Sequence, residues 1–159
     1  MRLDTISRRK TLVGATALLA ASPLSALAQG TEPAIHVMKD PNCSCCSAWI
    51  EILENDGFVV TTEASAGTLL MRYKLDNGIA QEMASCHTGR VDGYMIEGHV
   101  PVADIRRLLE ERLDAIGLAV PGMPYGSPGM GPEREREAYD VFLIRGDGST
   151  EVFTSYAAA

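Results

Sequence analysis

The sequence lacks a surplus of positive charge and the short motifs of several common protein classes. Among its 159 residues, 21 Asp and Glu outnumber 14 Lys and Arg, which gives a net charge of −7. An acidic surface argues against binding to nucleic acid and to anionic membranes. We find no phosphate-binding Gly-rich loop, no DNA-binding motif and no order of Ser, His and Asp that would indicate a hydrolase.

A hydrophobic run long enough to cross a membrane is also missing. The N-terminal apolar run, residues 12–28, is too short and too rich in alanine for a convincing membrane span. It follows Arg8 and Arg9 and ends at Ala26-Leu27-Ala28, an A-x-A cleavage site. We therefore expect residues 1–28 to be a twin-arginine signal peptide that directs export to the periplasm and is then removed. An uncleaved N-terminal anchor is the alternative.

The chain that remains after cleavage has 131 residues, enough to form a hydrophobic core without disulfide support. Because residues 1–28 carry four basic residues and one acidic residue, the rest has a net charge of −10. We expect most of these carboxylates to be solvated, and charge alone does not indicate a cation site.

The hydrophobic pattern of this part predicts an α/β fold. It indicates strands at 35–39, 58–62, 85–91 and 93–100, and helices at 44–56, 67–76 and 101–112. A Gly- and Pro-rich segment, 113–137, is expected to be irregular, and 138–156 reads as a β-hairpin. The order β-α-β-α-β-β-α predicts a thioredoxin-like mixed sheet with flanking helices, extended by a C-terminal loop and hairpin. We expect residues 34–117 to form the thioredoxin-like domain and residues 118–156 to pack on it.

Cysteine is scarce but concentrated. The chain has four cysteines, and three of them, Cys43, Cys45 and Cys46, fall within four residues. Cys43 and Cys46 form a C-x-x-C motif at a strand-to-helix turn, where thioredoxin-like folds carry their redox pair. At such a helix N-terminus the pKa of a thiol falls. In the expected fold, Cys86 and His87 begin the strand that faces this turn, so we expect both to approach the three clustered thiols.

Four interpretations of these thiols compete. A structural disulfide with spare thiols is the least favoured, and zinc fits poorly because three cysteines in four residues cannot easily surround one tetrahedral ion. A thiol–disulfide oxidoreductase would use Cys43 and Cys46, whose spacing suits a disulfide, but Cys45 and Cys86 would compete by exchange. Copper(I) is favoured, because it selects soft thiolates and bridging sulfurs let several ions share few ligands.

The remaining candidates are imidazoles, thioethers and one carboxylate. We expect His87 to be a metal ligand or a hydrogen-bond donor to one, whereas His99 is balanced between packing and metal binding, and His36 is expected to be structural in a buried strand. Met123 and Met130 recur in identical Pro-Gly-Met frames and are candidate copper ligands, with gap filling as the alternative. Asp40 is expected to cap the helix that follows.

Several of these motifs together resemble one known family. They are "KDPNCSCCSAWIEILENDGFVV", "MASCHT", "GYMIEGHVPVADIRRLL", "GLAVPGMPYGSPGM" and "YDVFLIRGDGSTEVF", which span nearly all of residues 35–156. In these segments the chain is similar to the CopG family of periplasmic copper-resistance proteins, which shares the C-x-C-C motif. Ser44 departs from the glycine found in many relatives, and His36 and Met38 replace commoner residues.

The resemblance implies a thioredoxin-like fold and a cysteine-bridged multinuclear Cu(I) cluster held by Cys43, Cys45, Cys46 and Cys86. We therefore expect a periplasmic protein of copper resistance or homeostasis, whose metal ligands also include His87, Met123 and Met130. Its expected partners are copper ions and other periplasmic copper-handling proteins. A metal-binding role is favoured over an enzymatic one, with copper-linked redox activity and the oxidoreductase left open.

Overall fold

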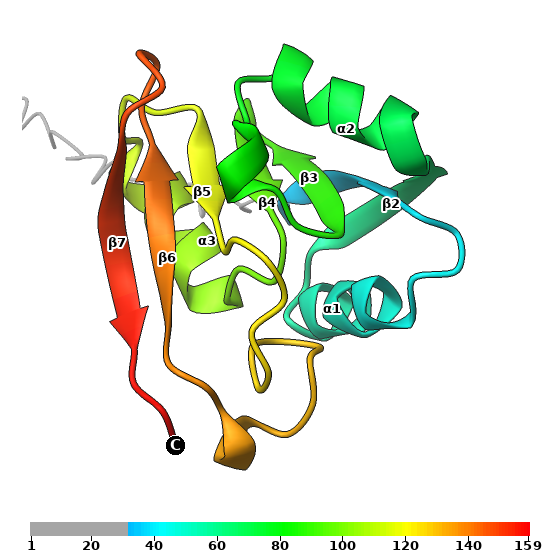
Figure 1. The fold of residues 1–159 in the computed structure, drawn as a ribbon, viewed down its shortest axis with the longest axis vertical. Helices are drawn as coiled ribbons and strands as arrows, with labels where there is room; N and C mark the ends of the chain where they lie inside the picture. Colours follow the sequence, from blue (N-terminus) through cyan, green and yellow to red (C-terminus); the bar gives the residue numbers. More distant parts are fainter. Residues whose placement is uncertain (1–31) are drawn as a thin grey trace, which may run out of the picture. The chain divides into compact units, whose positions relative to one another are not determined.

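The computed structural model describes residues 32–159, which form an α/β unit around one mixed sheet (Figure 1). The expected signal peptide, residues 1–28, lies outside the described residues. The strands are β1 (Ala34–Lys39), β2 (Val59–Ala64), β3 (His87–Val91), β4 (Tyr94–Glu97), β5 (Gly117–Ala119), β6 (Tyr139–Ile144) and β7 (Thr150–Tyr156). The helices are α1 (Ser44–Asn55), α2 (Gly67–Asp76) and α3 (Val102–Glu111), with short 3-10 turns η1 (Gln81–Met83) and η2 (Glu133–Glu135).

The sheet places the start of β3 beside the end of β1. Its order is β2-β1-β3-β4-β5-β6-β7, with parallel pairing of β1 to β2 and of β4 to β5, and antiparallel pairing elsewhere. In the β1–β3 register, Lys39 lies opposite His87. Because α1 follows the end of β1 and Cys86 precedes β3, this register brings the two cysteine-bearing segments to the same edge of the sheet (Figure 1).

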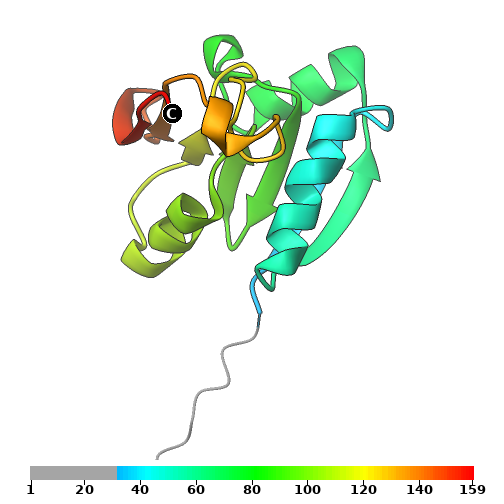
Figure 2. The ribbon, with the colours of Figure 1, turned by 90° about the horizontal axis from the view of Figure 1, so that it is seen from below.

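The two faces of the sheet are covered differently. The larger core joins Trp49 and Leu53 of α1 with Ile105 and Leu108 of α3, against inward residues of the strands that include Ile96. A smaller cluster lies on the other face, where Tyr73 of α2 and Ile79 of the loop after it pack with the strand residues Met95, Ala119 and Ile144. Successive residues of a strand point to opposite faces, which accounts for this division. Figure 2 shows α1 and α3 on the same side of the sheet.

The structure confirms the predicted α/β class, the mixed sheet, the flanking helices and the C-terminal hairpin, which extends the sheet through β6 and β7. The thioredoxin-like assignment and the division at residue 118 stay predictions. One part of the prediction is wrong: the segment 113–137 is not wholly irregular, because β5 pairs with β4 on one side and β6 on the other. Gly117 allows this approach, since a Cβ there would lie 1.7 Å from the carbonyl oxygen of Met95.

One smaller prediction also needs correction. His36 is not buried: its side chain is 43% exposed, and its ring contacts Thr61 and Glu63 on the neighbouring edge strand. Ile35 and Val37 take the core-facing positions of β1 instead, which the alternation of a strand explains. No helix within residues 32–159 is long and apolar enough to cross a membrane.

Candidate metal centre

The first turn of α1 carries three of the four cysteines. Cys43 is the N-cap residue of the helix, and its Sγ accepts a hydrogen bond from the backbone N–H of Cys46 at 3.2 Å. Asp40, predicted to cap this helix, instead accepts from the N–H of Asn42 and closes the turn before it. The helix is therefore capped by the sulfur of Cys43, and this hydrogen bond holds the C-x-C-C segment in the first turn of the helix.

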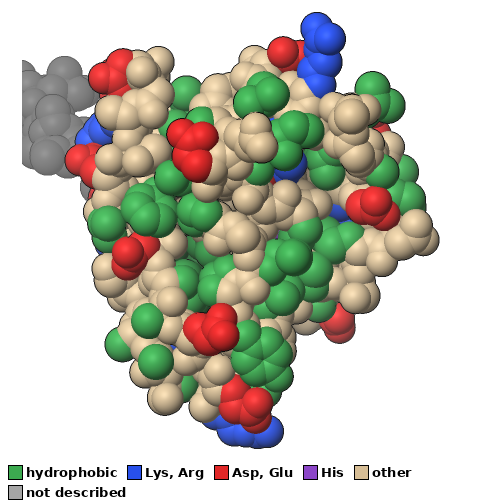
Figure 3. Space-filling model, in the orientation of Figure 1, with side chains coloured by type: hydrophobic (Ala, Val, Ile, Leu, Met, Phe, Trp, Pro, Cys, Tyr) green, Lys and Arg blue, Asp and Glu red, His purple; other side chains and the backbone are tan. Residues whose placement is uncertain are grey.

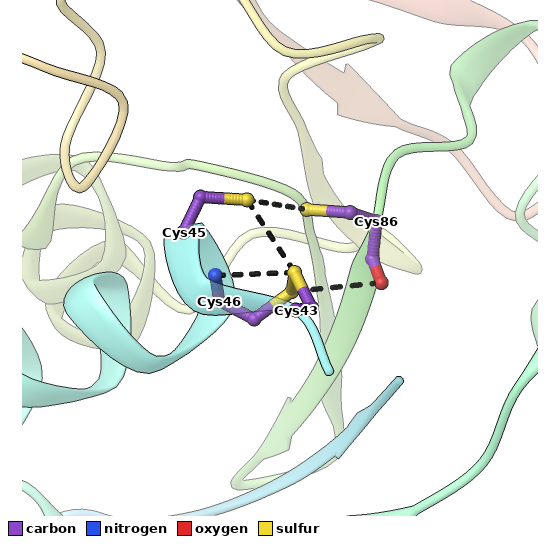
Figure 4. Close-up of side chains that lie close together, drawn as sticks. All are labelled: Cys43, Cys45, Cys46 and Cys86. Atoms are coloured by element: carbon purple, nitrogen blue, oxygen red, sulfur yellow. Dashed lines mark hydrogen bonds between the residues drawn. A yellow bond between two sulfur atoms is a disulfide. The ribbon is translucent and has the colours of Figure 1, made fainter. Parts of the chain in front are cut away.

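The fourth cysteine, Cys86, lies beside the other three although it is forty residues away from Cys46 in the sequence, as predicted. Cys86 Sγ lies 3.9 Å from Cys45 Sγ, and Cys45 Sγ lies 3.4 Å from Cys43 Sγ (Figure 4). The sulfurs of Cys43, Cys45, Cys46 and Cys86 all lie within 4.8 Å of one another. Cys46 is fully buried and the other three are partly exposed. The site is therefore a compact group of four sulfurs with one side open to solvent.

Two of these sulfurs are bonded to each other. Cys43 and Cys46 form a disulfide, while Cys45 and Cys86 are free thiols. Cys86 does not lie at the helix N-terminus but directly before β3. Burial, together with the neighbouring Cys45, raises the pKa of Cys86 to about 11. Cys86 is thus a neutral thiol until a metal ion or a base removes its proton.

Two buried histidines contact Cys86. His87 Nδ1 lies 3.3 Å and His99 Nε2 3.1 Å from its Sγ, and the three ligand atoms form a second compact group within 4.8 Å. The two imidazole rings meet edge to face, and the ring of Trp49 lies against His87. Burial lowers the pKa of both histidines, so both are neutral near pH 7. The sequence left His99 undecided between packing and metal binding, and the structure places it against a site cysteine.

A buried ion pair holds the segment that carries Cys86. Glu97 accepts hydrogen bonds from Lys74 Nζ at 2.5 Å, from Thr88 Oγ1 at 2.5 Å and from the backbone N–H of Ser85 at 2.6 Å. Burial raises the pKa of Glu97 and lowers that of Lys74, but each charge stabilises the other. Because Ser85 and Thr88, which flank Cys86 and His87 in the chain, both donate to Glu97, these hydrogen bonds fix the position of Cys86. The sequence pattern of α2 gave no signal that Lys74 would be buried.

The Gly-Pro-Met loop, residues 120–132, packs over this edge. The backbone of Gly129 lies against α1, where a Cβ would meet the amide nitrogen of Trp49 at 2.7 Å. Met130 lines a shallow hollow of 360 Å³ together with Cys45, whereas Met123 is 53% exposed. In Figure 3, hydrophobic side chains gather near the middle of the face drawn. The loop thus places one of its two methionines at a hollow that a cysteine also lines, and a ligand role for either stays a prediction.

Comparison with known proteins gives a consistent result. A family model described as "Protein of unknown function, DUF411" matches residues 83–130, and no curated protein matches the chain. Two solved structures, "Copper resistance protein copG- Form 2" and "Copper resistance protein copG- Form 1", are 45% and 46% identical to this chain, each with a TM-score of 0.74. The alignments cover 79% and 80% of this chain and 99% and 100% of the other. The resemblance seen in the sequence is confirmed, and the chain belongs to the CopG family of copper resistance proteins.

Proposed function

We propose that this protein binds copper(I) as its cargo at Cys43, Cys45, Cys46 and Cys86, in a cysteine-bridged multinuclear cluster that serves copper resistance. The observation that carries the proposal is the convergence of four sulfurs, from two segments forty residues apart, within 4.8 Å. Soft thiolates select Cu(I), and four of them carry enough charge to neutralise up to four such ions. Two relatives named for copper resistance support the same reading.

The disulfide determines when copper can bind. Cys43 and Cys46 contribute thiolates only after two electrons and two protons, supplied by a dithiol reductant, have opened the bond between them. Binding of Cu(I) then displaces the thiol protons to solvent. Copper loading should therefore depend on the redox state of the pair and on pH.

The outer parts of the site follow from the same chemistry. His87 contacts Cys86 and is proposed to stabilise its thiolate or to complete the copper coordination. Met130, which lines the same hollow as Cys45, and Met123, whose side chain is exposed, are proposed to contact the outermost ions through their thioethers. A thioether binds less tightly than a thiolate, which would let copper leave toward other periplasmic copper-handling proteins.

The cellular setting is inferred from the sequence of residues 1–28. We propose that residues 1–28 are a twin-arginine signal peptide, that residues 34–117 and 118–156 are exported as one folded domain, and that the protein works in the periplasm. The names of its relatives and the acidic composition of the mature chain are compatible with this setting.

The experiment compares Cu(I) uptake by the reduced wild-type chain and by Cys45→Ser, with Ser44→Ala in the same helical turn as the matched control. Loss of one bridging sulfur should lower the number of copper ions bound per chain, whereas Ser44→Ala should leave it unchanged. Equal copper content in all three proteins would contradict the proposal.

A second candidate, a thiol–disulfide oxidoreductase, is favoured by one observation: the Cys43–Cys46 disulfide itself. In this case Cys43, which is more exposed than Cys46, would exchange with a substrate thiol. Activity would then be lost in Cys43→Ser and Cys46→Ser but kept in Cys45→Ser. Full reductase activity of Cys45→Ser with unchanged copper content would favour this candidate over copper binding.

A further inference from the structure

One turn of the Gly-Pro-Met loop borders two separate hollows. This turn, residues 126–131, is called the strap below. Its Gly129, Met130 and Gly131 line the hollow of 360 Å³ that Cys45 also lines. Gly129 and Gly131 also line a second hollow of 330 Å³, whose other walls include Ile52. Protein interiors are close-packed, so a segment bordered by two hollows has room to shift that a core segment lacks.

The strap is held together by its own hydrogen bonds. The backbone N–H of Gly126 donates to the carbonyl oxygen of Met130 at 2.8 Å, and the N–H of Met130 donates to that of Ser127 at 2.8 Å. The base is fastened to the segment before β6, because the N–H of Glu137 donates to the carbonyl oxygen of Tyr125 at 2.9 Å. The strap can therefore move as one unit about a fixed base.

The tip of the strap contacts the site at two points. The carbonyl oxygen of Pro128 accepts a hydrogen bond from His99 Nδ1 at 2.8 Å, and within residues 32–159 this is the one hydrogen bond between strap and site. Gly129 lies against α1, where a Cβ would meet the amide nitrogen of Trp49 at 2.7 Å and the carbonyl oxygen of Cys45 at 3.0 Å. A single neutral hydrogen bond contributes little net stability, so the tip is weakly attached.

We propose that the strap moves between the closed position of this structure and an open position in which it has left α1, and that this motion controls access to Cys45. When the strap is closed, it and the first turn of α1 are walls of the hollow that Cys45 lines. When it opens, it withdraws into the second hollow, toward Ile52. No covalent bond breaks and no electron is transferred.

The consequence for copper is a controlled route to the four sulfurs. Cys46 is fully buried, whereas Cys45 is partly exposed at the hollow, so an ion would enter and leave past Cys45. This consequence rests on the proposed function. The control of access to Cys45 does not, because it follows from the contacts of the strap alone.

The test measures how fast N-ethylmaleimide alkylates Cys45 in the full chain with the disulfide intact, with Cys86 followed separately by peptide mass spectrometry. In Gly129→Ala the added Cβ collides with the backbone of α1, so the strap cannot close, and alkylation of Cys45 should be at least threefold faster. Gly122→Ala is the matched control. Gly122 also has a positive φ, 67° against 82° for Gly129, but a Cβ there would meet nothing within 4 Å, so the wild-type rate is expected.

A second variant tests the opposite direction. Ile52 is 36% exposed and lines the second hollow, so Ile52→Phe fills the space into which the strap withdraws. Alkylation of Cys45 should then be at least twofold slower, whereas Ile52→Val, which leaves the hollow open, should keep the wild-type rate. Because Ile52→Phe adds no strain to the strap backbone, it decides the question if Gly129→Ala does not fold.

The proposal is overturned if a folded Gly129→Ala is alkylated at the wild-type rate, if Gly122→Ala speeds alkylation equally, or if Ile52→Phe changes nothing. The copper readout is separate. Gly129→Ala should release Cu(I) to a chelator at least threefold faster at unchanged stoichiometry. Absent Cu(I) uptake by the reduced wild-type chain would contradict the proposed function, and the alkylation rates would still decide whether the strap controls access.

Discussion

Replacing Lys74 by Met should destabilise the fold strongly and in a pH-dependent way. Both partners of the Lys74–Glu97 pair are almost fully buried, with side chains 2% and 0% exposed. Removing one partner of a buried ion pair costs about 3–5 kcal/mol, because the other charge is left without compensation. For a domain whose stability is on the order of 5–15 kcal/mol, this loss is a large fraction of the total.

The pH dependence has a definite sign. Burial already raises the pKa of Glu97, and the ammonium that opposes this shift is gone in the variant. The folded variant then holds a proton that the unfolded chain releases, so its stability falls as pH rises from the unfolded-state pKa of Glu through the raised folded-state pKa. The deficit relative to wild type should be smallest at acid pH, where Glu97 is neutral in both states.

Urea unfolding at a series of pH values, followed by the fluorescence of the single tryptophan, measures this deficit. The double variant Lys74→Met/Glu97→Gln should recover most of the lost stability, because the amide oxygen still accepts from Ser85. Arg72→Met, which breaks an exposed pair on the same helix, should cost below about 1 kcal/mol. A loss of stability in Lys74→Met that is small, or equal at every pH, would contradict this prediction.

Three further predictions concern packing and the loop. Trp49→Phe removes the hydrogen bond from Nε1 to the carbonyl oxygen of Val100 at 2.9 Å, and thermal unfolding should report a loss of about 1–3 kcal/mol. Asp104→Ala removes the acceptor of two hydroxyl groups on β7, and hydrogen exchange in that strand should speed up while the strands nearest the cysteines keep their protection. Met123→Leu/Met130→Leu should fold normally and keep its thiolate-bound copper, but transfer copper to a chelator at an altered rate, and unchanged affinity, stoichiometry and transfer would assign both residues to packing.

The fold was largely predictable because its elements carry strong local patterns. Helix α2 was predicted with the bounds it has, since its apolar spacing ends at Asn77-Gly78. Strand β5 was missed because three residues beside a Gly- and Pro-rich segment carry no period of their own. Its extended conformation comes from pairing with β4 and β6, which lie on either side of it.

The site was predictable where topology determines it and not where single contacts do. The approach of Cys86 to the C-x-C-C turn followed from the expected strand order. The contact of His99 with Cys86 did not, because it depends on the carbonyl of Pro128 in an irregular loop. The pairing of Lys74 with Glu97 joins elements 23 residues apart, and neither residue type is expected in a core.

The disulfide was weighed in advance but not favoured. The spacing of Cys43 and Cys46 suited a bond, yet the surrounding thiols argued for a metal. The structure combines a disulfide between Cys43 and Cys46 with two free thiols, Cys45 and Cys86, close to it. This combination is what makes the redox state of the pair central to the proposed function.

The most direct test of the copper proposal is the number of Cu(I) ions bound by the reduced chain of residues 29–159, with free thiols counted before and after loading. We expect more than one copper per chain, retained against a competing chelator, and four thiols that become unreactive together. A chain that retains no copper, or that binds a single ion while Cys45 stays reactive, would contradict it.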